Sequence, residues 1–180
     1  MFRILLVICC LVLVQNHEPV LSWNTSYKLS WSDFKAKPNN NTSAVALTAS
    51  GITFGFSIRQ TDDNRVLSFE TDVNAHFYPE KSWYKSELAD NHVLGHERLH
   101  FDITELHARK FRQAISKLKT SQTIKNELRQ LHKSINKDLE VMQNAYDGET
   151  DYSRNVETQV KWQLFIINEL EKLSEYKTVD

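Results

Sequence analysis

The feature that most constrains the fold is a change of hydrophobic period near residue 90. Before it, short segments alternate apolar and polar side chains or form brief apolar runs between turn residues, as strands do. After it, apolar residues recur every three or four positions, as in amphipathic helices. Only 4 of the 180 residues are glycine and 3 are proline, which argues against a long linker. We therefore expect one α+β domain, a small N-terminal antiparallel sheet packed on three long C-terminal helices.

Four strands are expected in the front half. Gly51 lies in the turn between the second and third strands, because glycine tolerates the backbone angles of a tight turn. The segment 61–64 forms the next turn, and Pro79 ends the last strand. The expected strands cover residues 27–31, 44–48, 52–58 and 66–78.

Three helices are expected in the back half. The first begins after Asp90-Asn91 and runs to about Lys117, and the second follows a cap at Ser121. Turn-forming residues at 146–151 interrupt the apolar pattern of the second helix. The third helix follows this turn. Its expected buried stripe consists of Val156, Val160, Leu164, Ile167 and Leu170.

The first residues are typical of an export signal. A short positive start precedes an unbroken apolar run over residues 4–14, which is too short to cross a bilayer as a helix. We predict a signal peptide over residues 1–22 and a single domain over 23–180, exported to the periplasm or secreted. No second run approaches membrane-spanning length, so stable membrane insertion is not expected once the signal is removed.

The composition limits the chemistry that the domain can perform. Both cysteines, Cys9 and Cys10, lie in the predicted signal, so the domain has neither a disulfide nor a catalytic thiol. Any metal must then be held by His, Asp, Glu or Tyr. The net charge of -1 gives no reason to expect nucleic acid or an anionic membrane as a partner.

A metal-binding motif lies inside the first expected helix, His96-Glu97-Arg98-Leu99-His100. Residues four apart project from the same face of a helix, so His96 and His100 can converge on one ion. Zn²⁺ suits two neutral imidazoles and a third ligand, with a position left for water. Glu97 can then act as general base for attack on a carbonyl. A solvated polar helix face is the alternative interpretation of the motif.

The same helix does not provide the third ligand. Glu105 lies about 180° around the helix from His96. There it sits among Arg98, Asp102 and Arg109, and the spacings of three and four residues between opposite charges in this group predict surface ion pairs. His107 shares the histidine face but lies about 10 Å along the axis from His100, too far to reach the same ion. We expect His107 to be hydrogen-bonded or half-exposed.

The turn between the second and third helices is the best source of a third ligand. It gathers Tyr146, Asp147, Glu149, Asp151 and Tyr152. Aspartate and glycine are also ordinary turn formers, and Asp151 or Ser153 can simply cap the third helix.

A longer segment, residues 96–109, resembles the signature of a family of bacterial predicted secreted zinc-dependent proteases, formally a domain of unknown function. The similarity extends to Trp31-Ser32-Asp33-Phe34, Ala46-Leu47-Thr48, Ser50-Gly51-Ile52, Ser82-Trp83 and Tyr146-Asp147-Gly148-Glu149-Thr150. It covers nearly the whole expected domain. The resemblance implies a zincin-like fold, export, and Zn²⁺-dependent hydrolysis of a peptide or protein substrate.

The resemblance also assigns roles by position. His96 and His100 match the metal ligands and Glu97 the general base. Members of this family often carry a histidine where this chain has Tyr152. For the third ligand we favour Asp147, then Tyr152 and Glu149.

Two further interpretations stay open, a non-catalytic binding protein with a zincin-like fold and a zinc amidase acting on cell-wall peptides. By analogy with zincins, in which an edge strand pairs with an extended substrate, residues 73–77 are the candidate substrate strand. His76 is then either an oxyanion contact or an ordinary surface histidine.

Overall fold

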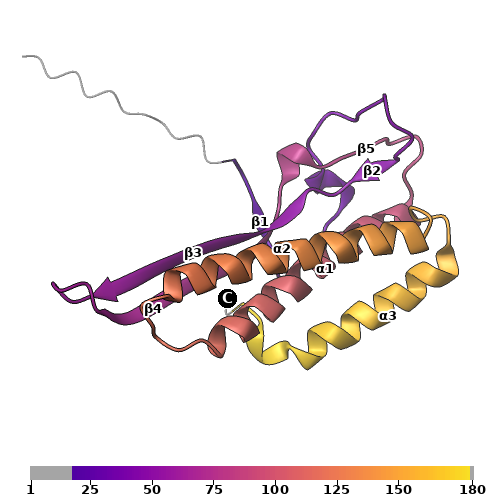
Figure 1. Ribbon diagram of the computed structural model, residues 1–180. Coiled ribbons are helices and arrows are strands. Elements are labelled where there is room, and N and C mark those ends of the chain that lie inside the picture. Colours follow the sequence, from indigo (N-terminus) through magenta and orange to yellow (C-terminus); the bar gives the residue numbers. More distant parts are fainter. Residues whose placement is uncertain (1–17, 179–180) are drawn as a thin grey trace, which may run out of the picture.

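The computed structural model describes residues 18–178 and confirms the α+β fold (Figure 1). Most of the predicted signal lies outside these residues. The strands are β1 (Leu21–Ser22), β2 (Ala46–Leu47), β3 (Ser50–Gln60), β4 (Val66–Phe77) and β5 (Trp83–Tyr84). The helices are α1 (Asn91–Ser116), α2 (Ile124–Glu149) and α3 (Val156–Lys172). None of the described helices has the length and apolar character needed to cross a membrane.

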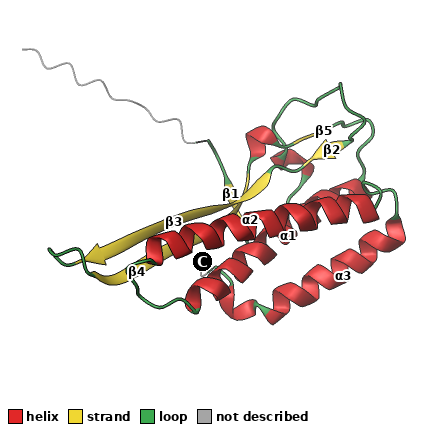
Figure 2. Ribbon diagram, viewed as in Figure 1, coloured by secondary structure: helices red, strands yellow, loops and turns green. Residues whose placement is uncertain are grey.

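The β3–β4 hairpin forms most of the three-stranded sheet β1-β4-β3. Its antiparallel pairs run from Ser50↔Phe77 to Gln60↔Val66, with a bulge near the turn, and β1 pairs with the other edge of β4 at Phe77 and His76. Figure 2 shows the helices gathered along one side of this hairpin. The alternate side chains that face the helices include the buried Ile52, Val73, Ala75 and Phe77.

The prediction of a first strand over residues 27–31 is wrong. The chain instead forms a 3-10 turn over Trp31–Asp33, because the Asp33 carboxylate accepts a hydrogen bond of 2.7 Å from the Ser30 backbone N–H. The segment 44–48 is extended only at β2, and β2 pairs with β5, not with β3. The physical reason lies at Ala49, whose N–H donates to Ser82 Oγ and whose carbonyl accepts from the Tyr78 N–H. These bonds prevent the expected hairpin turn.

At α2 both helix ends differ from expectation. Its N-cap is Thr123 and not Ser121, and the hydroxyls of both residues donate to Glu127, at 2.6 Å and 2.7 Å. The helix also continues through Gly148 to Glu149. The Thr150 hydroxyl and N–H both bond to the Tyr146 carbonyl and so complete its last turn. Residues 146–149 are therefore helical and their side chains have fixed directions.

The third helix packs by a different face from the one expected. Its cap is Asn155, which accepts from the Thr158 N–H, so neither Asp151 nor Ser153 caps it. The residues that it buries are Gln159 and Ile166, with Leu170 partly buried. The other four members of the expected stripe are 48–59% exposed, and they are Val156, Val160, Leu164 and Ile167.

Candidate metal centre

Two helices bring the predicted metal-binding residues together. His96 and His100 lie one turn apart near the start of α1, and Asp147 lies in the last turn of α2. Figure 1 shows the start of α1, the end of α2 and the start of α3 at the same end of the molecule, beside β2 and β5. Asp147 reaches the two histidines because α2 extends beyond its expected end.

The three side chains form a compact donor triangle. The Nε2 atoms of His96 and His100 are 3.2 Å apart, and Asp147 Oδ1 lies 3.1 Å and 3.0 Å from them. Ligand atoms around a tetrahedral zinc ion, with bonds near 2.0 Å, are about 3.3 Å apart. The triangle therefore fits an ion of this size, and among the described residues this is the group with the geometry of a metal site.

Gln143 sets the orientation of His100. Its Nε2 donates to the His100 carbonyl at 2.9 Å and to Thr104 Oγ1 at 3.3 Å, so its Oε1 is left as an acceptor. His100 Nδ1 lies against this Oε1 and must carry the proton of the bond. The lone pair of the neutral ring is then on Nε2, which points at Asp147 and His96. This tautomer is the one that a metal requires.

Tyr146 forms the wall behind the histidines. Its ring stacks on His96 with centroids 4.4 Å apart and meets His100 edge-on at 5.0 Å. Burial and the nearby carboxylates of Glu97 and Asp147 raise the pKa of Tyr146 far above its ordinary value. The phenol is therefore neutral at physiological pH and serves to pack the imidazoles, not as an anionic ligand.

The charge of Asp147 is stabilised by its neighbours. Burial by itself raises the pKa of the Asp147 carboxyl, but the hydrogen bonds and charges of His100 and His96 outweigh it, so this pKa lies well below its usual range. Burial has the reverse effect on a histidine and lowers the pKa of His100, but Asp147 and Glu97 raise this pKa, and its net value lies above the ordinary one. Asp147 is thus a carboxylate at any pH near neutrality, as a cation ligand must be.

Glu97 lies next to the donor triangle. It is buried, and its charge raises the pKa values of His100 and Tyr146. Its Oε2 atom has no hydrogen-bond partner among residues 18–178. A buried carboxylate oxygen without a hydrogen-bond partner costs stability, so its presence at this position is more typical of a functional residue than of a structural one.

The other proposed third ligands point elsewhere. Glu149 accepts a hydrogen bond of 2.8 Å from Trp162 Nε1. Tyr152 is 67% exposed and has a φ of 52°, one of three successive residues after α2 in the left-handed region. Asp151 forms an ion pair with Arg154. Asp147 alone of the candidates in this segment joins the histidines.

Glu105 and His107 do not contribute donors. Glu105 faces away from the metal site, but it is fully buried, where surface ion pairs were expected. Arg109 and Arg112 bind it at 2.8 Å and 3.2 Å, because α3 and the C-terminal segment cover this face of α1. His107 is buried and bonds through Nδ1 to the Ile103 carbonyl, and burial lowers its pKa.

The expected substrate strand at residues 73–77 is wrong, because β4 is the central strand. Its outer edge is occupied by β1 at residues 76 and 77, by the Trp23 N–H at Ala75, and by Arg112 at the Val73 carbonyl. His76 points to the sheet face opposite the helices, since Ala75 and Phe77 are buried toward them, and it contacts Thr53.

A different strand lies beside the metal-binding helix. The Thr48 hydroxyl donates to the Glu97 carbonyl at 3.2 Å, so β2 approaches α1 at the predicted base. The Lys85 N–H bonds to Val45, which turns the backbone groups of Ala46 away from β5.

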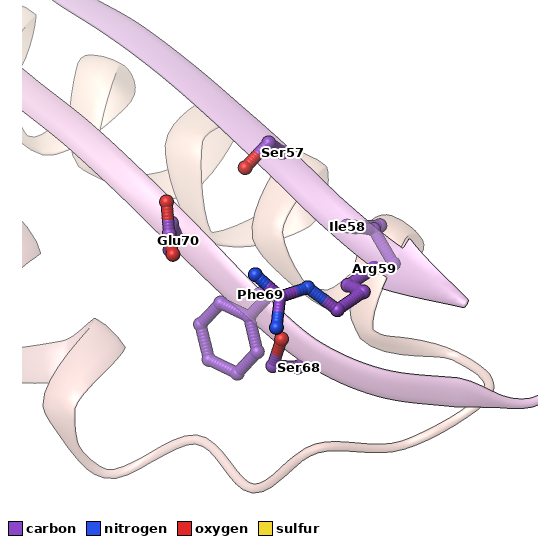
Figure 3. A pocket seen from close by; sticks show the side chains of 6 residues that line it. All are labelled: Ser57, Ile58, Arg59, Ser68, Phe69 and Glu70. Carbon is purple, nitrogen blue, oxygen red and sulfur yellow. The ribbon is translucent and has the colours of Figure 1, made fainter. Parts of the chain in front are cut away.

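A surface pocket lies away from this centre. It has a volume of about 270 Å³ and is formed by β3 and β4 near their connecting turn. Figure 3 shows the six side chains that line it, Ser57, Ile58, Arg59, Ser68, Phe69 and Glu70. None of these residues belongs to the donor triangle.

Sequence reasoning missed Gln143, and it named Tyr146 only as a member of the turn that gathers candidate ligands, not as a side chain that packs the histidines. The signal that finds them is helical spacing from Asp147. Gln143 lies four residues before Asp147 and Tyr146 lies in the same turn, so they share a face once α2 is extended to Glu149.

These features define a class, an α+β protein with a two-helix His/His/Asp group suited to a metal ion. Residues 22–154 match the family model described as "Bacterial protein of unknown function (DUF922)". The chain therefore belongs to this family. No curated protein and no solved structure matches the chain.

Proposed function

We propose that this protein is an exported zinc-dependent peptidase in which His96, His100 and Asp147 hold the metal. The donor triangle is the observation that carries this proposal. Two imidazoles and one carboxylate leave a fourth position open, which is the pattern of catalytic zinc sites. A zincin-like fold and export are proposed with it, on the resemblance of the helix motif and the signal-like first residues.

Glu97 is the proposed general base. When bound, zinc supplies a Lewis acid that polarises a carbonyl and acidifies water. In this proposal Glu97 Oε2, which has no hydrogen-bond partner among the described residues, accepts the proton that water loses on attack and returns it to the leaving amine. The low-dielectric surroundings of Glu97 strengthen this exchange.

The substrate is proposed to bind in an extended form along β2. The backbone groups of Ala46 face away from β5, and Thr48 contacts Glu97. An extended peptide that pairs with this edge would pass its carbonyl groups close to the base.

The test combines metal analysis with hydrolysis of an unfolded protein by the wild type and by Glu97→Gln. We expect the wild type to retain about one zinc per chain after dialysis and to cleave the substrate. Glu97→Gln should retain zinc and lose at least about 100-fold in rate, since general-base catalysis contributes roughly 10²–10⁴.

Three outcomes contradict the proposal. Loss of zinc by the wild type excludes a zinc centre, and retention of iron instead favours the redox chemistry that two histidines and a carboxylate also support. Retained zinc with equal inactivity of both forms favours a binding protein. Cleavage of cell-wall peptides in place of proteins favours an amidase.

A further inference from the structure

His96 and Gln159 each carry a buried polar atom without a partner. His96 Nδ1 and Gln159 Oε1 are inaccessible to solvent, and neither has a hydrogen bond within the part of the chain that the structure describes. Gln159 is only 1% exposed and lies in the face by which α3 packs on α1. A glutamine in such a position costs stability unless its amide is used.

The Gln159 amide lies against the turn of α1 that leads to His96. Its Nε2 donates to the carbonyl of His92 at 3.1 Å, and His92 is one helical turn before His96. The same nitrogen lies 3.7 Å from the position that a Cβ on Gly95 would occupy. Because Nε2 is engaged in this way, Oε1 is the half of the amide that is left to accept a hydrogen bond.

A metal ion on His96 creates the matching donor. With Nε2 bound to an ion, the neutral ring carries its proton on Nδ1, and a buried N–H must find an acceptor. Gln143 Oε1 already provides this acceptor for His100. Gln159 Oε1, on α3, is a buried acceptor that has no partner among the described residues.

We propose that Gln159 is a positioning residue for His96, its Oε1 accepting the Nδ1–H directly or through one ordered water. This inference rests on the proposed metal centre. It also gives a role to α3, a helix that begins beyond the segment 22–154 matched by the family. The two glutamines, from α2 and α3, then hold the two imidazoles of α1 in place.

Ser153 is the competing acceptor. It is 8% exposed, its Oγ is buried without a partner in the described segment, and its carbonyl contacts His92 Nε2 at 2.7 Å. Its replacement must therefore be measured beside that of Gln159.

The experiment uses the full chain and Zn²⁺ alone. Zinc affinity is measured by chelator competition for the wild type, Gln159→Leu, Gln159→Glu, Ser153→Ala and Gln163→Leu. Gln163 is the matched control, because its amide also lies beside Gly95, 3.6 Å from the same position. We expect Gln159→Leu to weaken zinc binding about 10- to 100-fold, as loss of a ligand's outer hydrogen bond does. Gln159→Glu, which keeps the acceptor, and the other two variants should stay within about threefold of wild type.

A second readout separates positioning from packing. Thermal unfolding in excess chelator should be unchanged for Gln159→Leu, because leucine has a similar volume and no amide to satisfy. Proton NMR of the zinc-loaded wild type should show a slowly exchanging His96 Nδ1–H signal, which Gln159→Leu should lose.

The outcomes are distinguishable. If the wild type binds no zinc, the proposed function and this inference both fail. If the wild type binds zinc and Gln159→Leu binds it equally well, this inference alone fails. If only Ser153→Ala weakens binding, the acceptor is Ser153 and not Gln159.

Discussion

At the scale of single residues, the three donors are held by different contacts. His100 is fixed by Gln143, and His96 is stacked on Tyr146. The carboxylate of Asp147 is held by the imidazoles themselves. Its side chain is 30% exposed, so it is the donor most dependent on the ion for a fixed position. It is also the residue that distinguishes this centre from a simple pair of histidines on one helix.

Asp147→Ala should therefore weaken zinc binding at least about 100-fold, beyond the effect expected for an outer hydrogen-bond partner. Glu149→Ala and Tyr152→Phe should bind zinc as the wild type does, because the first residue contacts Trp162 and the second is exposed. Chelator competition on the three variants is the measurement. A larger loss in Glu149→Ala or Tyr152→Phe than in Asp147→Ala would assign the third position to that residue.

The sequence predicted some of these residues and not others for a physical reason. His96, Glu97 and His100 share one helical turn, so local spacing is enough to place them. Asp147 was one of several candidates, because its position depends on where α2 ends. Gln143 and Gln159 carry no motif, and their partners are 39 or more residues away.

At the scale of elements, contacts between segments distant in the sequence determine features of the fold that the local hydrophobic pattern does not predict. The expected strand at 44–48 is extended only where β5 pairs with it. The packing of the third helix was likewise not predictable from its local pattern. Its apolar residues occupy more than one face, and burial follows the face that α1 contacts, which contains Gln159 and Ile166. A stripe of regular spacing, from Val156 to Ile167, is left exposed. Periodicity identified the helix but not its packing side.

This assignment of faces predicts effects of very different size at two positions on α3 that are two residues apart. Ile166→Glu should lower the free energy of unfolding by at least about 3 kcal/mol, because it places a charge in a fully buried position. Leu164→Glu should change it by no more than about 0.5 kcal/mol, since Leu164 is 59% exposed. Urea denaturation followed by circular dichroism measures both. Equal destabilisation would mean that the predicted stripe is buried after all.

At the scale of the whole molecule, a buried ionic network joins the helices to the sheet and the C-terminal segment. Glu105 lies at its centre, paired with Arg109 and Arg112. Arg109 also donates to the Leu170 carbonyl at the end of α3, and Arg112 donates to Val73 in β4 and to the Tyr176 carbonyl. The network lies on the face of α1 opposite the metal-binding histidines. It therefore stabilises the position of α1 without taking part in the candidate centre.

Removal of the central carboxylate should therefore destabilise the entire fold. Glu105→Ala leaves two guanidinium groups without their anion, one of them buried, and breaking a buried pair in this way costs about 3–5 kcal/mol. Glu157→Ala is the matched control, because Glu157 and Lys161 form an i,i+4 pair of the same spacing on the surface. Its replacement should leave the free energy of unfolding almost unchanged, since solvent screens such pairs. Denaturant titration of both variants measures this free energy. A Glu105→Ala protein as stable as Glu157→Ala would show that the network does not hold these elements together.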